Sequence, residues 1–186
     1  GELPLIDFKI AISKDYYTKS LYSKYITNEH SRKRVHLLRT YYDCILSTSK
    51  TINDDNSFLN CRINGLENKS PNIVIIDRKL KIKRNLNLFK NTKQKKILFT
   101  STSNLEKEKY LKSKGVKIFF IKKMIDMNDY KKLFKKLNKM GFSRIFVESG
   151  VTFFEFLYKF NFINTLYIFK SQKKLNNKKK YLFKKN

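Results

Sequence analysis

The sequence is short of the residues that mark secreted, membrane-spanning and dinucleotide-fingerprint proteins. Two cysteines in 186 residues are too few for a disulfide framework, which favours a reducing cytoplasm. No run approaches about 18 consecutive apolar residues, and the opening GELPLIDFKI has no basic segment before an apolar one, so we predict neither a membrane span nor a signal peptide. With five glycines, the chain also lacks a G-x-G-x-x-G motif.

Hydrophobic residues make up 41% of the chain, which excludes a disordered basic tail and supplies a real core. We see no internal repeat and no linker, and therefore expect one domain over residues 1–186. Gly1 is typical of a cleavage scar, which suggests an excised piece of a longer protein.

The net charge of +27 favours nucleic acid or another anionic partner. The chain has a single alanine, however, and only seven of its 42 basic residues are arginine. Lysine, asparagine and isoleucine have A/T-rich codons, so much of the basic excess is explained by codon drift. Nucleic-acid binding remains an alternative, although the aromatic residues follow core periodicity.

Short apolar runs alternate with segments of helical period, which indicates an α/β domain with a largely parallel sheet. Helices are expected from an N-cap at Thr27 to about Arg39, and over 104–114, 128–140 and 151–160. Residues 50–70 look like the longest loop, and the lysine-rich end, 170–186, is either a solvated tail or an unpartnered edge strand. The predicted strands cover residues 5–12, 44–47, 72–76, 96–100, 117–121, 144–148 and 165–169.

Most motifs of catalysis are missing. Cys44 and Cys61 lie far apart, His30 and His36 are six positions apart, and no zinc-deaminase or G-x-S-x-G pattern occurs, so no metal site is predicted. One turn stands out, V-E-S-G followed by V-T at 147–152, where a glycine between a strand and a helix lets backbone N–H groups approach a phosphate.

A longer pattern is more specific. Residues 23–62 carry S-K-Y-I-T, S-R-K-R-V-H-L-L-R and D-C-I-L-S-T-S-K-T-I-N-D-D-N-S-F-L-N-C-R without a gap, flanked by K-I-A-I-S-K-D, P-N-I-V-I-I-D, V-E-S-G-V-T and L-Y-I-F-K in order. In these motifs and their order, nearly the whole chain resembles the reductase domain of riboflavin biosynthesis, the C-terminal half of the bifunctional pyrimidine deaminase/reductase.

The resemblance implies a dihydrofolate-reductase-like, three-layer α/β/α fold with a mostly parallel sheet. It implies reduction by NADPH of the ribose of 5-amino-6-(5-phosphoribosylamino)uracil, a ribosylaminopyrimidine 5′-phosphate, to the ribityl product. It further implies a cytoplasmic homodimer, a possible fused N-terminal deaminase, and no nucleic-acid or membrane partner.

Site residues follow from the matched positions. Lys9, Asp55 and Glu148 are the catalytic candidates. The substrate would be bound by Ser23, Arg39, Leu59, Arg62 and Glu148. The cofactor would be bound by Ala11, Tyr25, Thr27, Thr51, Asp55, Arg78, Gly150, Val151 and Thr152, with Lys79 and 101–103 as alternatives to Arg78 for the 2′-phosphate.

The residue types suit these roles. Arg39 and Arg62 are two of seven arginines in a lysine-rich chain, and only a guanidinium binds a phosphate through two parallel hydrogen bonds. Lys9 interrupts an apolar strand, and Glu148 ends a predicted buried strand, where ligands gather in open α/β sheets. The alternatives to a role in the site are a solvated surface position for the two arginines, an edge position for Lys9, and capping of the next helix by Glu148.

The chain also departs from the family pattern. Tyr16 and Ser149 replace glycines, so the turn at Tyr16 is not expected to keep a positive φ unless its loop is rebuilt. The expected last strands are unrecognisable after Lys170. A decayed reductase that serves as a dimerisation partner of a deaminase is therefore a further alternative.

Overall fold

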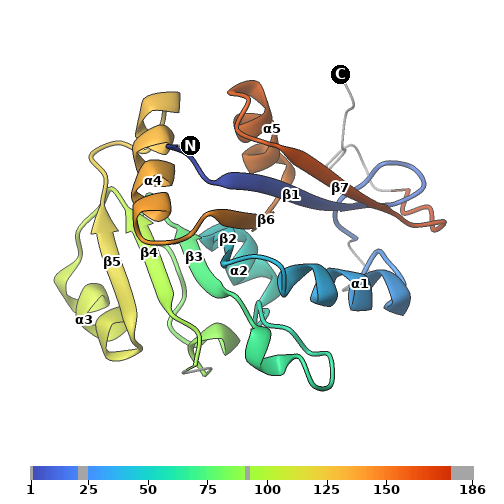
Figure 1. The fold of residues 1–186 in the computed structure, drawn as a ribbon, viewed down its shortest axis with the longest axis horizontal. Helices are drawn as coiled ribbons and strands as arrows, with labels where there is room; N and C mark the ends of the chain where they lie inside the picture. The colour runs from blue at the N-terminus through green and yellow to red at the C-terminus, as the bar shows by residue number, and fades with distance from the viewer. Residues whose placement is uncertain (1, 21–24, 91–92, 177–186) are drawn as a thin grey trace.

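The computed structural model describes residues 2–20, 25–90 and 93–176. In these residues seven strands form a single sheet, and five α-helices connect them (Figure 1). The strands are β1 (Leu5–Ile12), β2 (Cys44–Thr48), β3 (Asn72–Ile76), β4 (Lys96–Thr100), β5 (Val116–Phe120), β6 (Arg144–Glu148) and β7 (Thr165–Lys170). The helices are α1 (Glu29–Arg39), α2 (Ser49–Asp55), α3 (Leu105–Ser113), α4 (Met127–Lys139) and α5 (Val151–Lys159), with short 3₁₀ turns at Glu67–Lys69 and Asn87–Phe89.

The strands lie in the order β5-β4-β3-β2-β6-β1-β7, and all neighbouring pairs in the described sheet are parallel. The largely parallel sheet predicted from the sequence is confirmed. Four strands have the predicted bounds, β2 and β7 are one residue longer at their ends, and β5 is shifted by one residue toward the amino terminus. Central strands such as β3 (NIVII) are apolar on both faces, because helices cover both sides of a parallel sheet.

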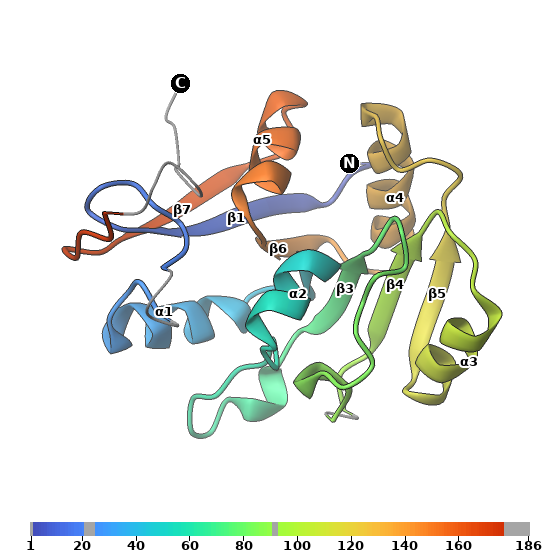
Figure 2. The same cartoon turned by 180° about the vertical axis from the view of Figure 1, so that it is seen from behind.

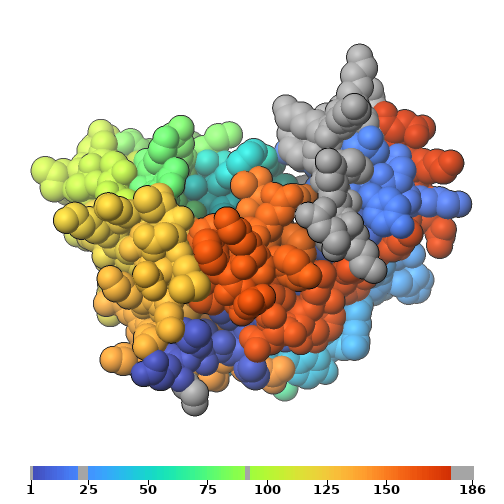
Figure 3. Space-filling model, turned by 90° about the horizontal axis from the view of Figure 1, so that it is seen from above, coloured from blue at the N-terminus to red at the C-terminus, as the bar shows by residue number. Residues whose placement is uncertain are grey.

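Helices cover the sheet in two layers (Figure 2). On one face α4 and α5 lie side by side (Figure 3), and Tyr130 of α4 contacts Phe153 and Phe156 of α5. On the other face, buried residues of α1, α2 and α3 pack on β2, β3 and β4. The predicted three layers are thus present. Within the described ranges, no helix is both long enough and apolar enough to cross a membrane.

Helix α4 shows how local sequence fixes an element. The Asp126 carboxylate caps its first turn by accepting from the N–H of Asp129 at 2.9 Å. Leu133 and Leu137, one turn apart, are fully buried against the sheet. Gly141 follows with a φ of +89°, a conformation that stops the helix. The predicted span of 128–140 differs from the observed one by a single residue at each end.

Two local predictions were wrong. Residues 50–55 of the expected loop at 50–70 belong to helix α2, because the Thr48 hydroxyl caps this helix and Ile52 anchors it in the core. Too few apolar residues lie in this stretch to show a helical period. Helix α1 is capped by Asn28, whose side chain accepts from the Ser31 N–H at 2.9 Å, and not by Thr27.

The turn after β1 also differs from expectation. Tyr16 keeps a positive φ of 66° although it carries a side chain. Its N–H donates to the Ser13 carbonyl at 3.0 Å, and the Lys170 ammonium lies 4.6 Å from the centre of its ring. These contacts, from the turn and from the end of β7, stabilise a conformation that glycine adopts without strain.

The described part of the lysine-rich end is neither a solvated tail nor an unpartnered edge strand. Residues 171–176 return to the loop after β1, where Lys14 N–H donates to the Lys173 carbonyl at 2.8 Å. The Asp15 carboxylate accepts from the N–H groups of Leu175 and Asn176 at 2.8–3.0 Å. Burial opposes the ionised carboxylate, but the hydrogen bonds from Ser13, Leu175 and Asn176 lower the pKa of Asp15 to about 2. Residues 177–186 lie outside the described part.

Candidate active site

The chain reverses its direction of growth across the sheet between β2 and β6. From β2 it adds strands outward to β5, and then returns to insert β6 between β2 and β1. In open parallel sheets, ligands bind beyond the carboxyl ends of the strands at such a reversal. The carboxyl ends of β2 and β6 carry Thr48 and Glu148, and both belong to clusters of polar side chains.

The first cluster joins three predicted residues. Lys9 and Glu148 are directly paired in the register of β1 and β6. Arg39, the last residue of α1, reaches Glu148 with both sides of its guanidinium: Nε lies 2.7 Å from Oε1 and Nη2 lies 3.1 Å from Oε2. The side chains of Arg39 and Glu148 are 9% and 13% exposed, so the ion pair is largely withdrawn from water.

The electrostatics of this cluster follow from burial and from its charges. Burial lowers the pKa of Lys9, although Glu148 opposes the effect. Burial also acts to raise the pKa of Glu148, but the charge and hydrogen bonds of Arg39, with Lys9, hold it below its usual value. Asp55, at the end of α2, is accessible at the rim, yet desolvation by the surrounding protein raises its pKa, with contributions from Asp54 and Glu148. Lys9 and Glu148 both act on this pKa, so the charges of these three side chains influence one another.

A second arginine lies next to the first, with a histidine between them. His36 Nδ1 is 3.0 Å from the Asn60 carbonyl, which also accepts from Arg39 Nη1 at 2.7 Å. His36 Nε2 lies 3.2 Å from Nη2 of Arg62. The predicted pair Arg39 and Arg62 is therefore brought together through His36 and Asn60. Arg62 is exposed and, with Asn60 and Lys93, lines an open pocket of about 380 Å³.

Three hydroxyl groups form the other cluster, at the carboxyl ends of β2 and β6. Thr48 Oγ1, Thr51 Oγ1 and Ser149 Oγ lie 2.9–3.2 Å from one another. Gly150 is the N-cap of α5 and has no side chain to cap it, so the first N–H groups of this nine-residue helix are not capped by their own N-cap residue. Hydroxyl donors beside a helix N-terminus suit an anionic group such as a diphosphate.

The remaining predicted residues are more dispersed. Ala11 lies two residues beyond Lys9 on the same face of β1. Leu59 is buried in the core under α1, with a φ of 50°. Arg32 of α1 lies 4.5 Å over the ring of Tyr25 and donates to the Thr27 carbonyl. The other predicted residues lie at the ends of β3 (Arg78, exposed) and in the first turn of α5 (Val151 and Thr152), while Ser23 lies outside the described residues.

The sequence analysis missed several polar groups of these clusters. His36 could have been chosen, because it stands in the quoted pattern S-R-x-x-x-H-x-x-R. Thr48 and Ser149 directly follow buried stretches of strand and could have been inferred from that position. Asn60 contributes its main-chain carbonyl, which carries no sequence signal. In the part of the chain that the structure describes, no group of three or more His, Cys, Asp or Glu could hold a metal ion.

Comparison with known proteins gives consistent matches along the chain. Residues 4–173 match the family described as RibD C-terminal domain. The riboflavin biosynthesis protein RibD of Aquifex aeolicus is 29% identical over 170 residues, which cover 90% of this chain and 46% of that protein. The protein of the same name from Buchnera aphidicola subsp. Baizongia pistaciae is 33% identical over 204 residues, with 97% and 51% covered. The chain thus spans about half the length of these relatives.

Solved structures show the same fold. The deaminase/5-amino-6-(5-phosphoribosylamino)uracil reductase of Thermotoga maritima superposes with a TM-score of 0.78 at 22% identity, covering 95% of this chain and 47% of that one. The riboflavin biosynthesis reductase Rib7 of Saccharomyces cerevisiae gives 0.73 at 24% identity, with 95% and 77% covered. The expected dihydrofolate-reductase-like arrangement of three layers is therefore confirmed.

Proposed function

The chain belongs to the RibD C-terminal domain family, and from this membership we propose that it is an NADPH-dependent reductase of riboflavin biosynthesis. Its substrate would be 5-amino-6-(5-phosphoribosylamino)uracil, whose ribose it reduces to the ribityl chain. The observation that carries the proposal is the cluster of Lys9, Glu148 and Arg39 with Asp55 at its rim. A lysine whose pKa is lowered, beside two carboxylates whose pKa values are shifted in opposite directions, is typical of a site that moves protons.

The reaction needs one hydride and one proton. NADPH, when bound, supplies the hydride for C1′ of the ribose. The ring opens when the bond from C1′ to the ring oxygen breaks and the nitrogen on C1′, which keeps its own proton, forms an iminium ion, so the ring oxygen must take up a proton. Lys9 is the candidate donor, because burial lowers its pKa and makes the ammonium a better acid. Asp55 and Glu148 would orient the sugar hydroxyls.

The residues at the ends of β2 and β6 fit the cofactor. The hydroxyls of Thr48, Thr51 and Ser149, next to the uncapped first turn of α5, form a donor set for its diphosphate. Arg78 at the end of β3 would meet the 2′-phosphate. Among the other cofactor-binding residues we retain Ala11, Tyr25, Thr27 and residues 150–152.

The substrate phosphate requires cationic donors outside the buried ion pair. Arg39 is occupied by Glu148, so we assign the phosphate to Arg62, with Ser23 and Leu59 completing the substrate site. We further propose that residues 1–186 form one reductase domain, that it acts as a homodimer, and that a deaminase domain accompanies it, as the length of the relatives suggests.

Purified protein with NADPH and the ribosylaminopyrimidine substrate tests the proposal through the fall in absorbance of NADPH. We expect turnover that Asp55→Asn lowers by about 100-fold, because Asp55 orients the reacting sugar and a small misplacement has an effect of this size. Asp54→Asn is the matched control, since the neighbouring Asp54 pairs with exposed Lys19 and Lys50 outside the cluster. Absence of cofactor binding at millimolar NADPH, followed by its fluorescence, would refute an active reductase.

A further inference from the structure

His36 has a place in the site that none of the functional assignments uses. It lies between the two arginines, is half-buried on α1, and contacts both of them and the Asn60 carbonyl. We propose that His36 is a positioning residue which, as a neutral imidazole protonated on Nδ1, orients the Arg62 guanidinium toward the phosphate of the substrate. The role in substrate binding rests on the proposed function, whereas the protonation state of His36 does not.

The neighbours of each ring nitrogen determine this tautomer. Nδ1 lies 3.0 Å from the Asn60 carbonyl, which can only accept, and 3.3 Å from Nη1 of Arg39, which can only donate. Because that nitrogen already donates to the same carbonyl at 2.7 Å, the shorter contact of Nδ1 with the acceptor assigns the proton to Nδ1. Nε2 lies 3.4 Å from Nε and 3.2 Å from Nη2 of Arg62, which can only donate, so Nε2 must offer a lone pair. The other tautomer would direct an N–H group at the guanidinium and leave the Asn60 carbonyl without the imidazole donor.

The surrounding charges keep this state over the physiological range. Burial, Arg39 on the same helix and Arg62 on the loop after Asn60 lower the pKa of His36 to about 4, and the hydrogen bond to Asn60 and the charge of Glu148 on β6 only partly oppose them. His36 therefore remains an acceptor near neutral pH. A phosphate dianion bound at Arg62 would favour the imidazolium and raise this pKa, because it adds negative charge beside the ring.

Space for such an anion exists next to Arg62. Two of its nitrogens face His36, while the residue also lines the pocket of about 380 Å³ described above. Arg39 lacks this freedom, because its fork is paired with Glu148 and its third nitrogen donates to Asn60. The neutral imidazole thus holds the Arg62 guanidinium in place and leaves its positive charge available. A carboxylate partner would neutralise that charge.

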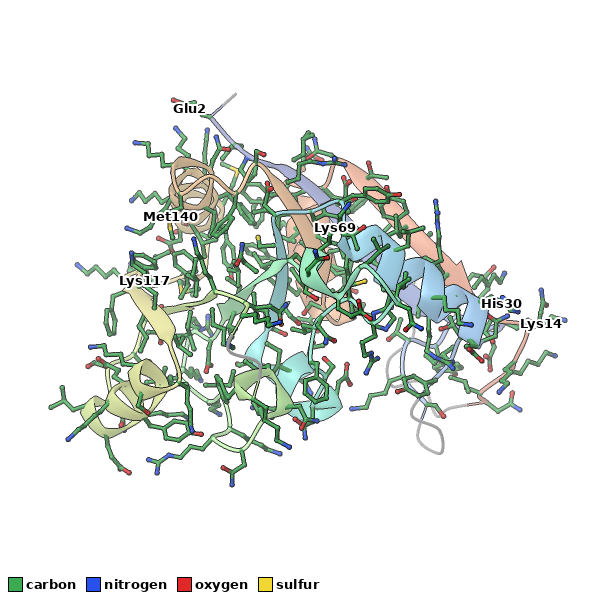
Figure 4. All side chains as sticks on the ribbon, turned by 60° about the horizontal axis from the view of Figure 1, so that its bottom comes forward. Glu2, Lys14, His30, Lys69, Lys117 and Met140 are labelled. Atoms are coloured by element: carbon green, nitrogen blue, oxygen red, sulfur yellow. The ribbon has the colours of Figure 1, made fainter. Side chains whose placement is uncertain are left out.

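The chain has only two histidines, so nuclear magnetic resonance of the imidazole nitrogens can observe His36 directly. His30, exposed at the amino-terminal end of α1 (Figure 4), is the internal reference, and His36→Gln assigns the signals. We expect His36 to show the Nδ1–H tautomer at pH 7 and to titrate near pH 4. Ribose 5-phosphate should shift the His36 signals and raise its pKa, whereas ribose should not, and His30 should respond to neither.

Kinetics then separate positioning from a structural role. His36→Leu should raise KM for the phosphorylated substrate by about tenfold with little change in kcat, the loss of roughly one hydrogen bond to a charged group. His36→Gln, which can donate to Asn60 and accept from Arg62, should restore KM. An Nε2–H tautomer, or an unchanged KM in His36→Leu, would overturn the inference. If the predicted tautomer and the response to ribose 5-phosphate are found but NADPH is never consumed, the proposed function fails and the role of His36 toward the phosphate stands.

Discussion

Lys9→Met is expected to increase the stability of the fold while it abolishes turnover. Lys9 lies on β1 with its ammonium near Glu148, in surroundings that lower its pKa because they exclude water. Methionine has a similar length and volume, so no cavity is formed. The substitution removes the unfavourable desolvation of one cation, and Glu148 keeps both of its hydrogen bonds to Arg39.

The size of the effect follows from what remains in the cluster. The bidentate pair of Arg39 and Glu148 is largely buried and still satisfied, so the lost attraction between Lys9 and Glu148 is smaller than the relief of desolvation. We expect the free energy of unfolding to rise by about 0.5–2 kcal/mol, which is the range of other substitutions that relieve strain at active sites. For a chain of this size, each kcal/mol corresponds to about 2–4 °C in Tm. The rate should fall by at least about 100-fold.

The sign of the pH dependence gives an independent check. The pKa of Lys9 is lower in the folded state than in the unfolded state, where it is about 10.4. The unfolded chain therefore binds more protons between the two values, and stability gains a contribution as pH rises through this interval. This contribution should vanish in Lys9→Met.

Urea denaturation at pH 7 and pH 10, with NADPH consumption measured in parallel, tests these expectations. Lys132→Met, at an exposed position of α4, is the matched control and should change neither stability nor rate. A fall in the unfolding free energy of more than about 1 kcal/mol in Lys9→Met alone would show that the ammonium stabilises the cluster, contrary to the reasoning. Full activity of the variant would remove Lys9 from the chemistry.

Three further outcomes are expected from other parts of the molecule. The amide proton signal of Leu175 should titrate with the Asp15 carboxylate at a pKa of about 2, and this step should be absent in Asp15→Asn. A titration near 4 would show that the hydrogen bonds from Leu175 and Asn176 to Asp15 are not formed in solution. Thr51→Val should raise KM for NADPH by about tenfold through loss of one donor, whereas Thr165→Val, at an exposed position of β7, should not. Leu137→Ala should lower the unfolding free energy by about 2–5 kcal/mol in urea, because the side chain is fully buried; a loss below about 1 kcal/mol would contradict its place in the core.

The sequence alone predicted those elements whose apolar pattern is strong. Helix α4 has a clear helical period and β3 is a continuous apolar run, so their bounds were correct to within one residue. Helix α2 was missed, because it is held by the Thr48 cap and by Ile52 and by little other burial. The positive φ at Tyr16 depends on Lys170, more than 150 positions away, which no local pattern contains.

The residues of the cluster were predicted from their positions in the sequence, but one of their contacts was not. Lys9, Arg39 and Glu148 were chosen and do converge, but Arg39 pairs with Glu148 and was expected to bind phosphate. That pairing depends on the crossing of α1 over the end of β6, which the spacing of residues in sequence does not specify. The role of the Asn60 carbonyl could not be predicted either. Every residue has a carbonyl, and only the fold determines which one lies next to Arg39.

The placement of β1 has a consequence for the order in which the molecule forms. Among the described residues, this first strand pairs only with β6 and β7, at a separation of more than 130 residues, whereas β2 to β5 pair with their sequence neighbours. At a synthesis rate of about 5–20 residues per second, the apolar segment LIDFKIAI waits roughly 8–30 s for its partners to leave the ribosome. Because Lys9 lies on this strand, the cluster of Lys9, Glu148 and Arg39 cannot form until β6 has been synthesised. Nascent fragments can thus build half of the sheet without acquiring the site.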